Sequence, residues 1–139
     1  MERFAKCYLD GVVRTQGELF DLFNHRYPGC DTADFMQTYL QSRTRLDIDH
    51  GQAYVTTMDC ETLMDRFLEV DKYIPTPGVV IGGFRPDWIG RFYALYQWTA
   101  GLSSVETLAA VPLDYISNAY RGLHDLDLPL AVEKVLKGV

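Results

Sequence analysis

The sequence lacks the patterns by which many enzymes and metalloproteins are recognised. It has three cysteines and three histidines, with no Cys-x-x-Cys and no His-Glu-x-x-His spacing. It also has no phosphate-binding loop ending in Gly-Lys-Ser/Thr and no Gly-x-Ser-x-Gly nucleophile turn. We therefore expect no catalytic residue, no metal and no cofactor, and predict that the chain is not an enzyme.

Long apolar runs and an excess of positive charge are absent as well. No apolar stretch approaches the roughly 20 residues of a membrane-spanning helix. Residues 1–4 do not begin a signal peptide, so we expect a cytoplasmic protein without a membrane partner. The 13 lysines and arginines stand against 19 aspartates and glutamates, a net charge of −6. This acidity disfavours nucleic acid as a partner and suits a protein, above all one with a basic groove.

Aromatic residues are plentiful, and they gather in one segment. The chain has nine tyrosines, seven phenylalanines and two tryptophans among 139 residues, a length that fits a single domain over residues 1–139. Pro86 fits the start of a helix and Gly101 its end. At about 100° per residue this helix is apolar nearly all round, at Trp88, Ile89, Phe92, Leu95 and Tyr96. We predict a central helix at 86–100, with Trp88, Phe92 and Tyr96 nearly inaccessible.

The rest of the chain shows helical spacing of apolar residues between residues that start and stop helices. Thr15 and Ser103 each precede a glutamate by three positions, the spacing of a capping box, so each is expected to start a helix. Asp31 and Asp59 are expected N-caps. An earlier helix is expected from Glu2 to Val13.

The helix expected after Asp31 runs through residue 49, with Leu46 facing inward and Arg45 on its polar face. Residues 52–57 are expected to be extended. Residues 71–85, rich in proline and glycine, are expected to form the longest and most mobile loop. These patterns predict an all-α fold: a single-domain orthogonal bundle of about seven short helices around the central aromatic helix (86–100).

Two short segments combine aspartates with a histidine, a composition that a cation such as Mg²⁺ can use. They are Asp47 and Asp49 with His50, and His124 with Asp125 and Asp127. Helix ends collect the same residues for capping and for the helix dipole, so both interpretations stay open. A metal-assisted hydrolase is accordingly one alternative function.

Residues 101–136 resemble the helix-turn-helix of Cro and repressor-type regulators. The likeness lies in Leu102-Ser103, Glu106-Thr107-Leu108-Ala109, Ile116-Ser117 and Arg121-Gly122. It implies a DNA-binding regulator whose second helix reads base pairs. About three residues, including the turn glycine, are missing before Ile116. The second helix also has only one arginine, which argues against phosphate binding.

A broader resemblance relates residues 35–137 to small uncharacterised proteins of Firmicute prophages and mobile elements. It rests on Gly82-Gly83-Phe84, Pro86-Asp87-Trp88-Ile89-Gly90, Gln97-Trp98, Pro112-Leu113 and Gly122-Leu123-His124-Asp125-Leu126-Asp127. The resemblance implies a setting and no reaction: a regulator, an antitoxin or an inhibitor of a host defence nuclease. A protein-binding module of this kind is our leading hypothesis.

The aromatic helix also offers a candidate binding face on its less apolar side. Asp87, Arg91 and Trp98 lie within about 40° of one another there, and the first two have the i, i+4 spacing of an ion pair. The candidate partner-binding residues are Trp98, Arg91, Asp87, Phe84 and Arg85. Trp98 is either a partly exposed contact residue or is buried under the 71–85 loop, and the sequence leaves both open.

Overall fold

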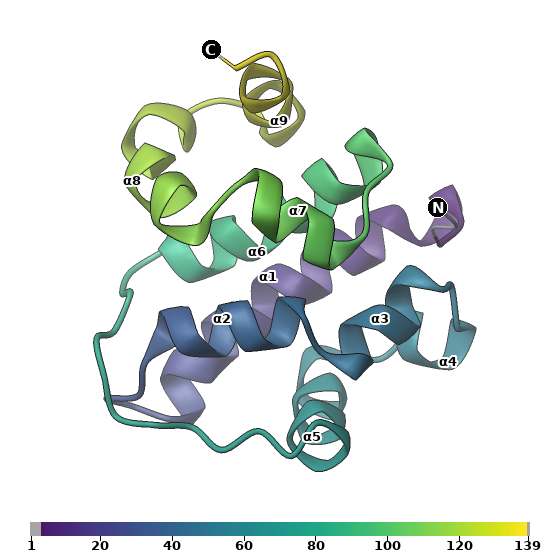
Figure 1. Cartoon of the computed structure of the whole chain (residues 1–139), viewed down its shortest axis with the longest axis vertical. Coiled ribbons are helices and arrows are strands. Elements are labelled where there is room, and N and C mark those ends of the chain that lie inside the picture. Colours follow the sequence, from purple (N-terminus) through teal and green to yellow (C-terminus); the bar gives the residue numbers. More distant parts are fainter. Residues whose placement is uncertain (1–3, 139) are drawn as a thin grey trace.

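The computed structural model describes residues 4–138, and over these residues the chain is all-α (Figure 1). A 3₁₀ turn, η1 (Lys6–Tyr8), precedes nine α-helices, and the single β feature of the described chain is a bridge between Cys30 and Pro77. The helices are α1 (Leu9–Arg26), α2 (Thr32–Leu40), α3 (Arg43–Asp49), α4 (Ala53–Thr56), α5 (Cys60–Val70), α6 (Arg85–Ala100), α7 (Ser104–Ala110), α8 (Leu113–Leu123) and α9 (Leu128–Leu136). Within residues 4–138, no helix combines the length and the apolarity that crossing a membrane requires. The predicted all-α bundle is confirmed.

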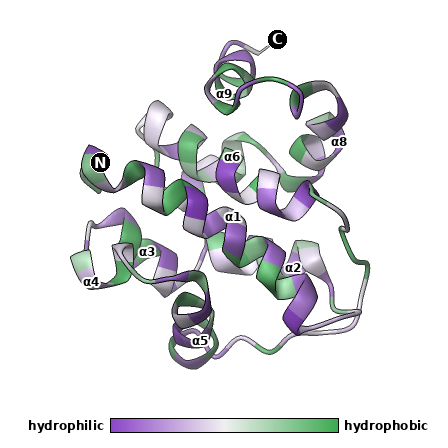
Figure 2. Ribbon diagram, turned by 180° about the vertical axis from the view of Figure 1, so that it is seen from behind, coloured by the Kyte–Doolittle hydropathy of each residue, from purple (hydrophilic) through white to green (hydrophobic). Residues whose placement is uncertain are grey.

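The two longest helices, α1 and α6, pack against each other at the centre of the bundle (Figure 2). Their backbones approach closely, since a Cβ atom added to Gly90 would lie 2.5 Å from the carbonyl oxygen of Gln16. A Cβ atom on Gly17 would lie 2.7 Å from the Arg91 side chain. The Gln16 Nε2 group donates a hydrogen bond of 2.8 Å to the Gly90 carbonyl. This approach requires glycine at both positions, because any side chain would separate the helices.

The larger aromatic cluster lies outside α6, among residues whose helical spacing marks them as inward-facing but does not show that they meet. It is centred on Phe35 of α2, whose ring stacks on Phe23 of α1 with 4.1 Å between centroids. Phe67 of α5 meets the Phe35 ring edge-on, and Tyr73 stacks on Phe67. Aromatic pairs in these geometries add to the stabilisation that burial provides. The cluster joins α1, α2 and α5 into one half of the core.

The aromatic residues of α6 form a second cluster. Phe92 and Tyr96 are buried, as predicted. Trp88 is only partly buried, so the prediction was wrong for this residue. Its ring stacks on Phe92 and meets Tyr120 of α8 edge-on, near the N-terminal end of α6 where fewer helices cover it.

Local capping signals predicted several helix starts correctly. The Asp31 and Asp59 side chains accept hydrogen bonds at the starts of α2 and α5, and Ser103 forms a complete capping box with Glu106. Thr15 does not start a helix, because α1 runs unbroken through it. Packing against α6 overrides the capping signal here. The predicted first helix begins at residue 2, outside the described residues.

Two predictions between residues 31 and 57 were wrong. The expected single helix stops after Leu40, and the Ser42 side chain caps a new helix by accepting a hydrogen bond from the Arg45 N–H. The restart rotates the helical phase, so Arg45 is fully buried and Leu46 is 41% exposed. The segment 52–57 contains a short helix, α4, in place of an extended link.

The close crossing of α1 and α6 predicts opposite effects at two glycines. We expect Gly90→Ala to destabilise the protein by about 1–3 kcal/mol, since the new methyl group overlaps the Gln16 carbonyl. Gly122→Ala in α8 is the matched control, because a Cβ atom there meets nothing within 4 Å. It should stabilise by up to about 1 kcal/mol through helix propensity. Urea unfolding measures both, and equal effects would contradict the crossing.

Buried tyrosines predict a loss of stability at alkaline pH. Burial raises the pKa of Tyr39 and of Tyr93, whereas both phenols ionise at about pH 10 in the unfolded chain. Above that pH the folded state holds protons that the unfolded state releases, so the free energy of unfolding falls as pH rises. The Tyr93 hydroxyl donates to the Val111 carbonyl at 2.7 Å. The Tyr39 hydroxyl has no hydrogen-bond partner in residues 4–138.

Both Tyr→Phe variants should therefore flatten the alkaline decline, but only one should weaken the protein at neutral pH. Tyr93→Phe should cost about 1 kcal/mol there, and Tyr39→Phe should cost little. Denaturant titrations between about pH 7 and pH 11 compare the two variants with the parent. An identical decline in all three proteins would show that these phenols do not cause it.

Candidate functional site

The structure places the candidate residues of α6 at two ends of that helix. Trp98 is half-buried near its C-terminal end, and the indole N–H donates to the Phe4 carbonyl at 3.2 Å. Phe84 and Arg85 lie at the N-terminal end, about 20 Å away along the helix axis. Trp98 is therefore partly covered, and the N-terminal segment contributes to this cover through Phe4. The predicted contact residues therefore span most of the length of α6.

Asp87 and Arg91 form the predicted ion pair. The Arg91 Nε atom lies 2.6 Å from Asp87 Oδ1, and both side chains are about one third exposed. The pair sits over Gly17 of α1, so it contributes to the crossing of α1 and α6.

The long segment between α5 and α6 follows a defined path across the outside of the bundle (Figure 1). We call residues 71–84 the strap. Its Thr76 carbonyl accepts from the Asp31 N–H at 2.8 Å, and its Val79 carbonyl accepts from the Thr32 N–H at 3.2 Å. The fully buried Thr32 side chain also accepts from the Ile81 N–H. These bonds to the start of α2 argue against the mobility predicted for this loop.

The strap exposes large apolar side chains although it is fixed in place. Ile74, Val79 and Phe84 are 77%, 78% and 84% exposed, the three highest values for large apolar residues in the described chain. Val80 is 44% exposed. Single exposed apolar residues are ordinary, but several on one short segment mark a candidate interaction surface.

A cavity opens between the strap, α2 and α8. Its volume is about 230 Å³. The lining residues are Ala33, Gln37, Ile81, Leu113, Asp114, Ser117 and Asn118. The strap therefore forms part of the cavity wall, through Ile81.

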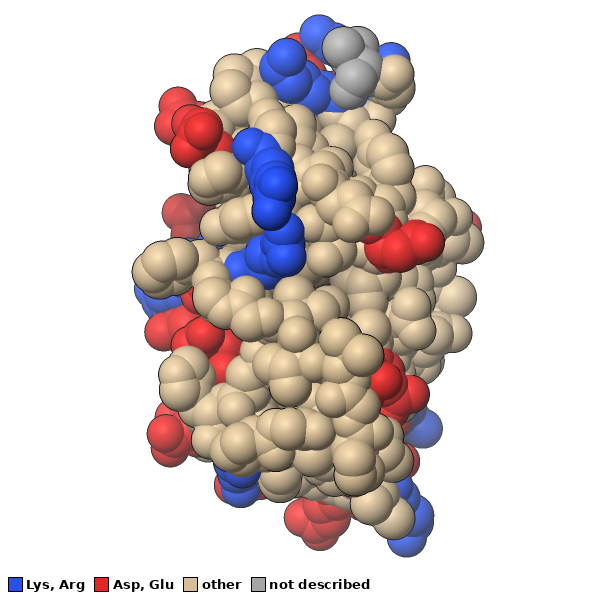
Figure 3. Space-filling view, turned by 90° about the vertical axis from the view of Figure 1, so that its left-hand side faces the viewer, with Lys and Arg blue, Asp and Glu red and all other residues tan. Residues whose placement is uncertain are grey.

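Two arginines, Arg85 at the start of α6 and Arg121 in the last turn of α8, have no carboxylate of residues 4–138 within 4.0 Å. Of the arginines in residues 4–138, the ones within 4.0 Å of an aspartate or glutamate are Arg14, Arg26, Arg43, Arg45, Arg66 and Arg91. Arg85 and Arg121 are the exceptions, and the Arg85 guanidinium lies 5.6 Å from the centre of the Tyr120 ring. Figure 3 shows this side of the molecule, where a short line of basic side chains stands above a broad uncharged area.

We call this surface the strap–α8 face. It consists of the four exposed apolar residues of the strap, the adjoining cavity and the two unpaired arginines. Phe84 and Arg85 were identified from the sequence. The sequence also favours the 71–85 loop, which includes Ile74, Val79 and Val80, as part of a binding surface. Arg121 and the cavity beside α8 were not identified, because only the fold brings α8 and the strap together.

The first aspartate–histidine segment is part of a buried ionic network. Arg45 donates to Asp49 Oδ1 at 2.9 Å and to Gln97 Oε1 of α6 at 2.8 Å. The other Asp49 oxygen accepts from the Ser104 N–H at the start of α7, at 2.9 Å. Asp47 pairs with Arg43 and Arg66, whereas His50 is exposed. These carboxylates point to arginines, so they serve the packing of the bundle.

The second aspartate–histidine segment lies on the surface after α8. His124 Nε2 lies 3.2 Å from an oxygen of Asp125, and the ring stacks on Tyr120. Asp127 precedes α9 as its N-cap residue. Among the described residues, no three His, Cys, Asp or Glu side chains gather as metal ligands would. The hydrolase hypothesis therefore has no ligand cluster in this part of the chain.

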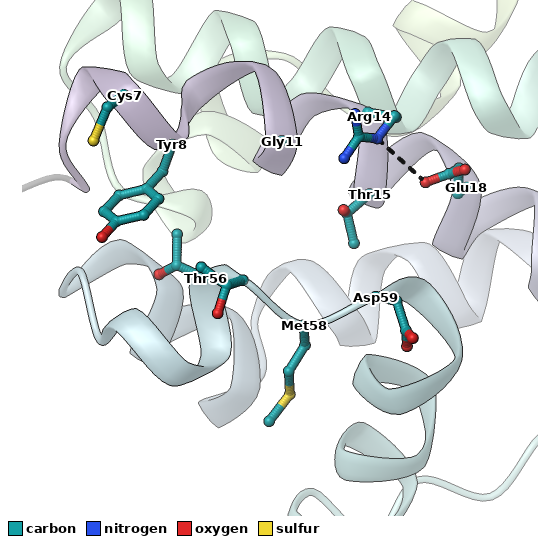
Figure 4. A pocket seen from close by; sticks show the side chains of 10 residues that line it. Cys7, Tyr8, Gly11, Arg14, Thr15, Glu18, Thr56, Met58 and Asp59 are labelled. Carbon is teal, nitrogen blue, oxygen red and sulfur yellow. Dashed lines mark ion pairs between the residues drawn. The ribbon is translucent and has the colours of Figure 1, made fainter.

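Two hollows border α1 on another side of the molecule. The first, of about 310 Å³, lies between α1 and the link from α4 to α5 (Figure 4). Arg14 and Glu18 line it from α1 and pair at 3.8 Å, opposite Met58 and Asp59. Asp59 is occupied as the cap of α5, and its pKa is lowered by the hydrogen bonds from Thr62.

The second hollow, of about 390 Å³, brings together a cysteine and a histidine that sequence spacing did not connect. Cys60 and His25 line it with Glu18, Asp21 and Asp87. Burial, then Glu18 and other nearby carboxylates, raise the pKa of the Cys60 thiol. This disfavours the thiolate that a nucleophile requires.

The helix-turn-helix likeness falls on α7 and α8, which only Val111 and Pro112 separate. Both helices pack into the bundle through buried residues, Leu113 and Ile116 among them. Comparisons of the chain with protein-family models, with curated proteins and with solved structures found no match. Neither resemblance noted in the sequence thus has support from a relative, and both stay predictions.

The buried network predicts a large difference between two aspartates. Asp49→Ala should destabilise the protein by about 3–5 kcal/mol, because it leaves Arg45 buried without a counter-charge. Asp65→Ala removes the exposed partner of Arg26 and should cost about 1 kcal/mol or less. Chemical denaturation compares the two. A loss at Asp49 no larger than at Asp65 would refute a structural role for the network.

Proposed function

We propose that this chain is a protein-binding module in the cytoplasm and that the strap–α8 face is its docking surface. The observation that carries the proposal is the exposure of Ile74, Val79 and Phe84 on a segment that hydrogen bonds hold in place. Exposed apolar side chains add nothing to the stability of the isolated fold. They gain burial when a partner covers them.

The residues around the apolar area support the same function. Arg85, Arg121 and Tyr120 border it, and arginine and tyrosine are enriched at protein interfaces. A rigid scaffold that presents an irregular segment is also a common arrangement for binding sites.

A role as a regulator, an antitoxin or an inhibitor of a host defence nuclease is compatible with this proposal. Each would act by occupying a surface of another protein. The net charge predicts a partner with a basic groove. Acidic residues that such a groove could bind lie elsewhere on the molecule, for example Glu18, Asp21 and Glu61 beside α1 and α5. The strap–α8 face itself carries unpaired positive charge.

The two alternative functions have less support. A DNA-binding regulator would need more basic residues than Arg121 on α8, where Asp114 also lies. A metal-assisted hydrolase would need a set of ligands that the described residues do not bring together.

Site-specific photocrosslinking tests the proposal. We expect benzoylphenylalanine in place of Phe84 to give a discrete protein adduct in cells of the native source. The same residue in place of Tyr54, which is 57% exposed and outside the face, should give none. Adding Val79→Asp to the first protein should reduce the adduct about tenfold, because it places a charge in an apolar contact.

Val79→Asp should change the free energy of unfolding by no more than about 0.5 kcal/mol, since the side chain is exposed. The loss of the adduct would then report binding and not folding. Equal adducts from positions 84 and 54, or none from either, would refute the docking surface.

A further inference from the structure

The strap leaves part of its backbone unpaired. Both peptide groups of Ile81 point inward, since its N–H donates to Thr32 Oγ1 at 3.0 Å and its carbonyl accepts from Asn24 Nδ2 at 2.6 Å. The Val79 carbonyl also bonds inward, to the Thr32 N–H, and this alternation along the chain places the peptide groups of the exposed residues Val80 and Gly82 on the outer side. Neither residue has a hydrogen-bond partner in residues 4–138. Unpaired groups of this kind are a template for another extended chain.

The cavity beside Ile81 offers a place for a side chain of such a partner. Ala33 and Leu113 form apolar parts of its wall, and its volume is about 230 Å³. Asp114 stands at its rim, at the start of α8. The cavity therefore accepts an apolar side chain and disfavours an acidic one at this end of the face.

The opposite end of the face is positive. Arg121 lies one turn after Ser117 on the same side of α8, about 10 Å along the helix axis from Asp114. Arg85 is the first residue of α6, where the helix dipole disfavours a cation. No carboxylate of residues 4–138 lies within 4.0 Å of its guanidinium, since Asp87 in the same turn pairs with Arg91. Within the fold the Arg85 guanidinium meets the Tyr120 ring at 5.6 Å, and a carboxylate of a partner would add the counter-charge that the described residues do not supply.

We propose that the strap–α8 face binds an extended segment of a partner protein in which apolar and acidic residues alternate. The backbone of the segment pairs with Val80 and Gly82, an apolar side chain enters the cavity, and carboxylates meet Arg85 and Arg121. Strand addition of this kind takes affinity from main-chain hydrogen bonds and specificity from side-chain pockets. The inference rests on the proposed function, because it states the partner chemistry for the same face.

Two other occupants fit the face less well. A nucleic acid would meet only two arginines on a chain of net charge −6, with Asp114 at the cavity. A second copy docking through the same face about a two-fold axis would bring Arg85 and Arg121 of both copies together, without carboxylates to neutralise them.

Selection from a random-peptide phage library on the immobilised protein tests this chemistry. We expect the enriched peptides to alternate apolar residues with Asp or Glu. The double variant Arg85→Glu/Arg121→Glu should bind the best peptide about 100-fold more weakly in fluorescence anisotropy, about tenfold for each arginine. Arg14→Glu/Lys137→Glu makes the same change of net charge outside the face, and should weaken binding less than about threefold.

Two further readouts separate backbone pairing from simple charge attraction. The amide signals of Val80 and Gly82 should shift in an NMR titration with the peptide. N-methylation of the peptide at its pairing positions, which keeps every side chain, should abolish binding. Thermal unfolding of the double variant checks that it is folded, and Arg85→Glu is favourable at a helix N-terminus.

Several results would overturn the inference: no enriched peptide, enriched peptides without acidic residues, full affinity in the double variant, or unmoved Val80 and Gly82 signals. If one of these results is found together with a protein adduct at position 84, the proposed function stands and the partner has a different chemistry. Alternatively, the parent protein binds a random DNA duplex, or forms a dimer in sedimentation, and loses this property in the double variant. Either result would identify nucleic acid or a second copy as the occupant and reject the extended peptide segment.

Discussion

One carboxylate, that of Asp49, joins α3 to the consecutive helices α6 and α7, through residues that follow it by 48 and 55 positions. It accepts from Arg45 on its own helix, from the Gln97 amide on α6 and from the Ser104 N–H at the start of α7. Since α7 leads into α8 after two residues, this contact helps to place α8 relative to α6, together with the bond from the Tyr93 hydroxyl to Val111. The position of α8, and of Arg121 on it, therefore depends in part on a charge buried in the core.

The net charge of the chain is a sum over the whole molecule and does not give the charge of one face. The net charge of −6 predicted an acidic surface, yet Asp47 and Asp49 are buried and neutralised by arginines. Because arginines accompany these carboxylates into the interior, burial of the pairs changes which residues lie on the surface and leaves the net charge of the surface almost unchanged. What a partner meets is local, and on the strap–α8 face the local charge is opposite in sign to that of the whole chain.

Sequence reasoning succeeded where the cause is local. Capping by Asp31 and Ser103 and the apolar circumference of α6 depend on neighbouring residues. It failed at Arg45, because the helix breaks at Ser42. The new helix starts with a different rotation about its axis, and this changes which residues face the core. Phe84 and Arg85 were identified as candidates from their place beside α6. Whether an arginine lacks a carboxylate, or a strap residue finds Thr32, depends on the whole fold and has no local signal.

The strap connects two parts of the chain that also pack directly against each other. Helix α1 precedes the strap and α6 follows it, yet these two pack backbone to backbone at Gly17 and Gly90. Covalent continuity through the strap therefore adds mainly a loop-closure entropy to folding. A single proteolytic cut near the exposed Val80 would leave both fragments associated through the core. It would remove the continuous edge at which a partner strand pairs, so the same cut would end docking while the bundle persists.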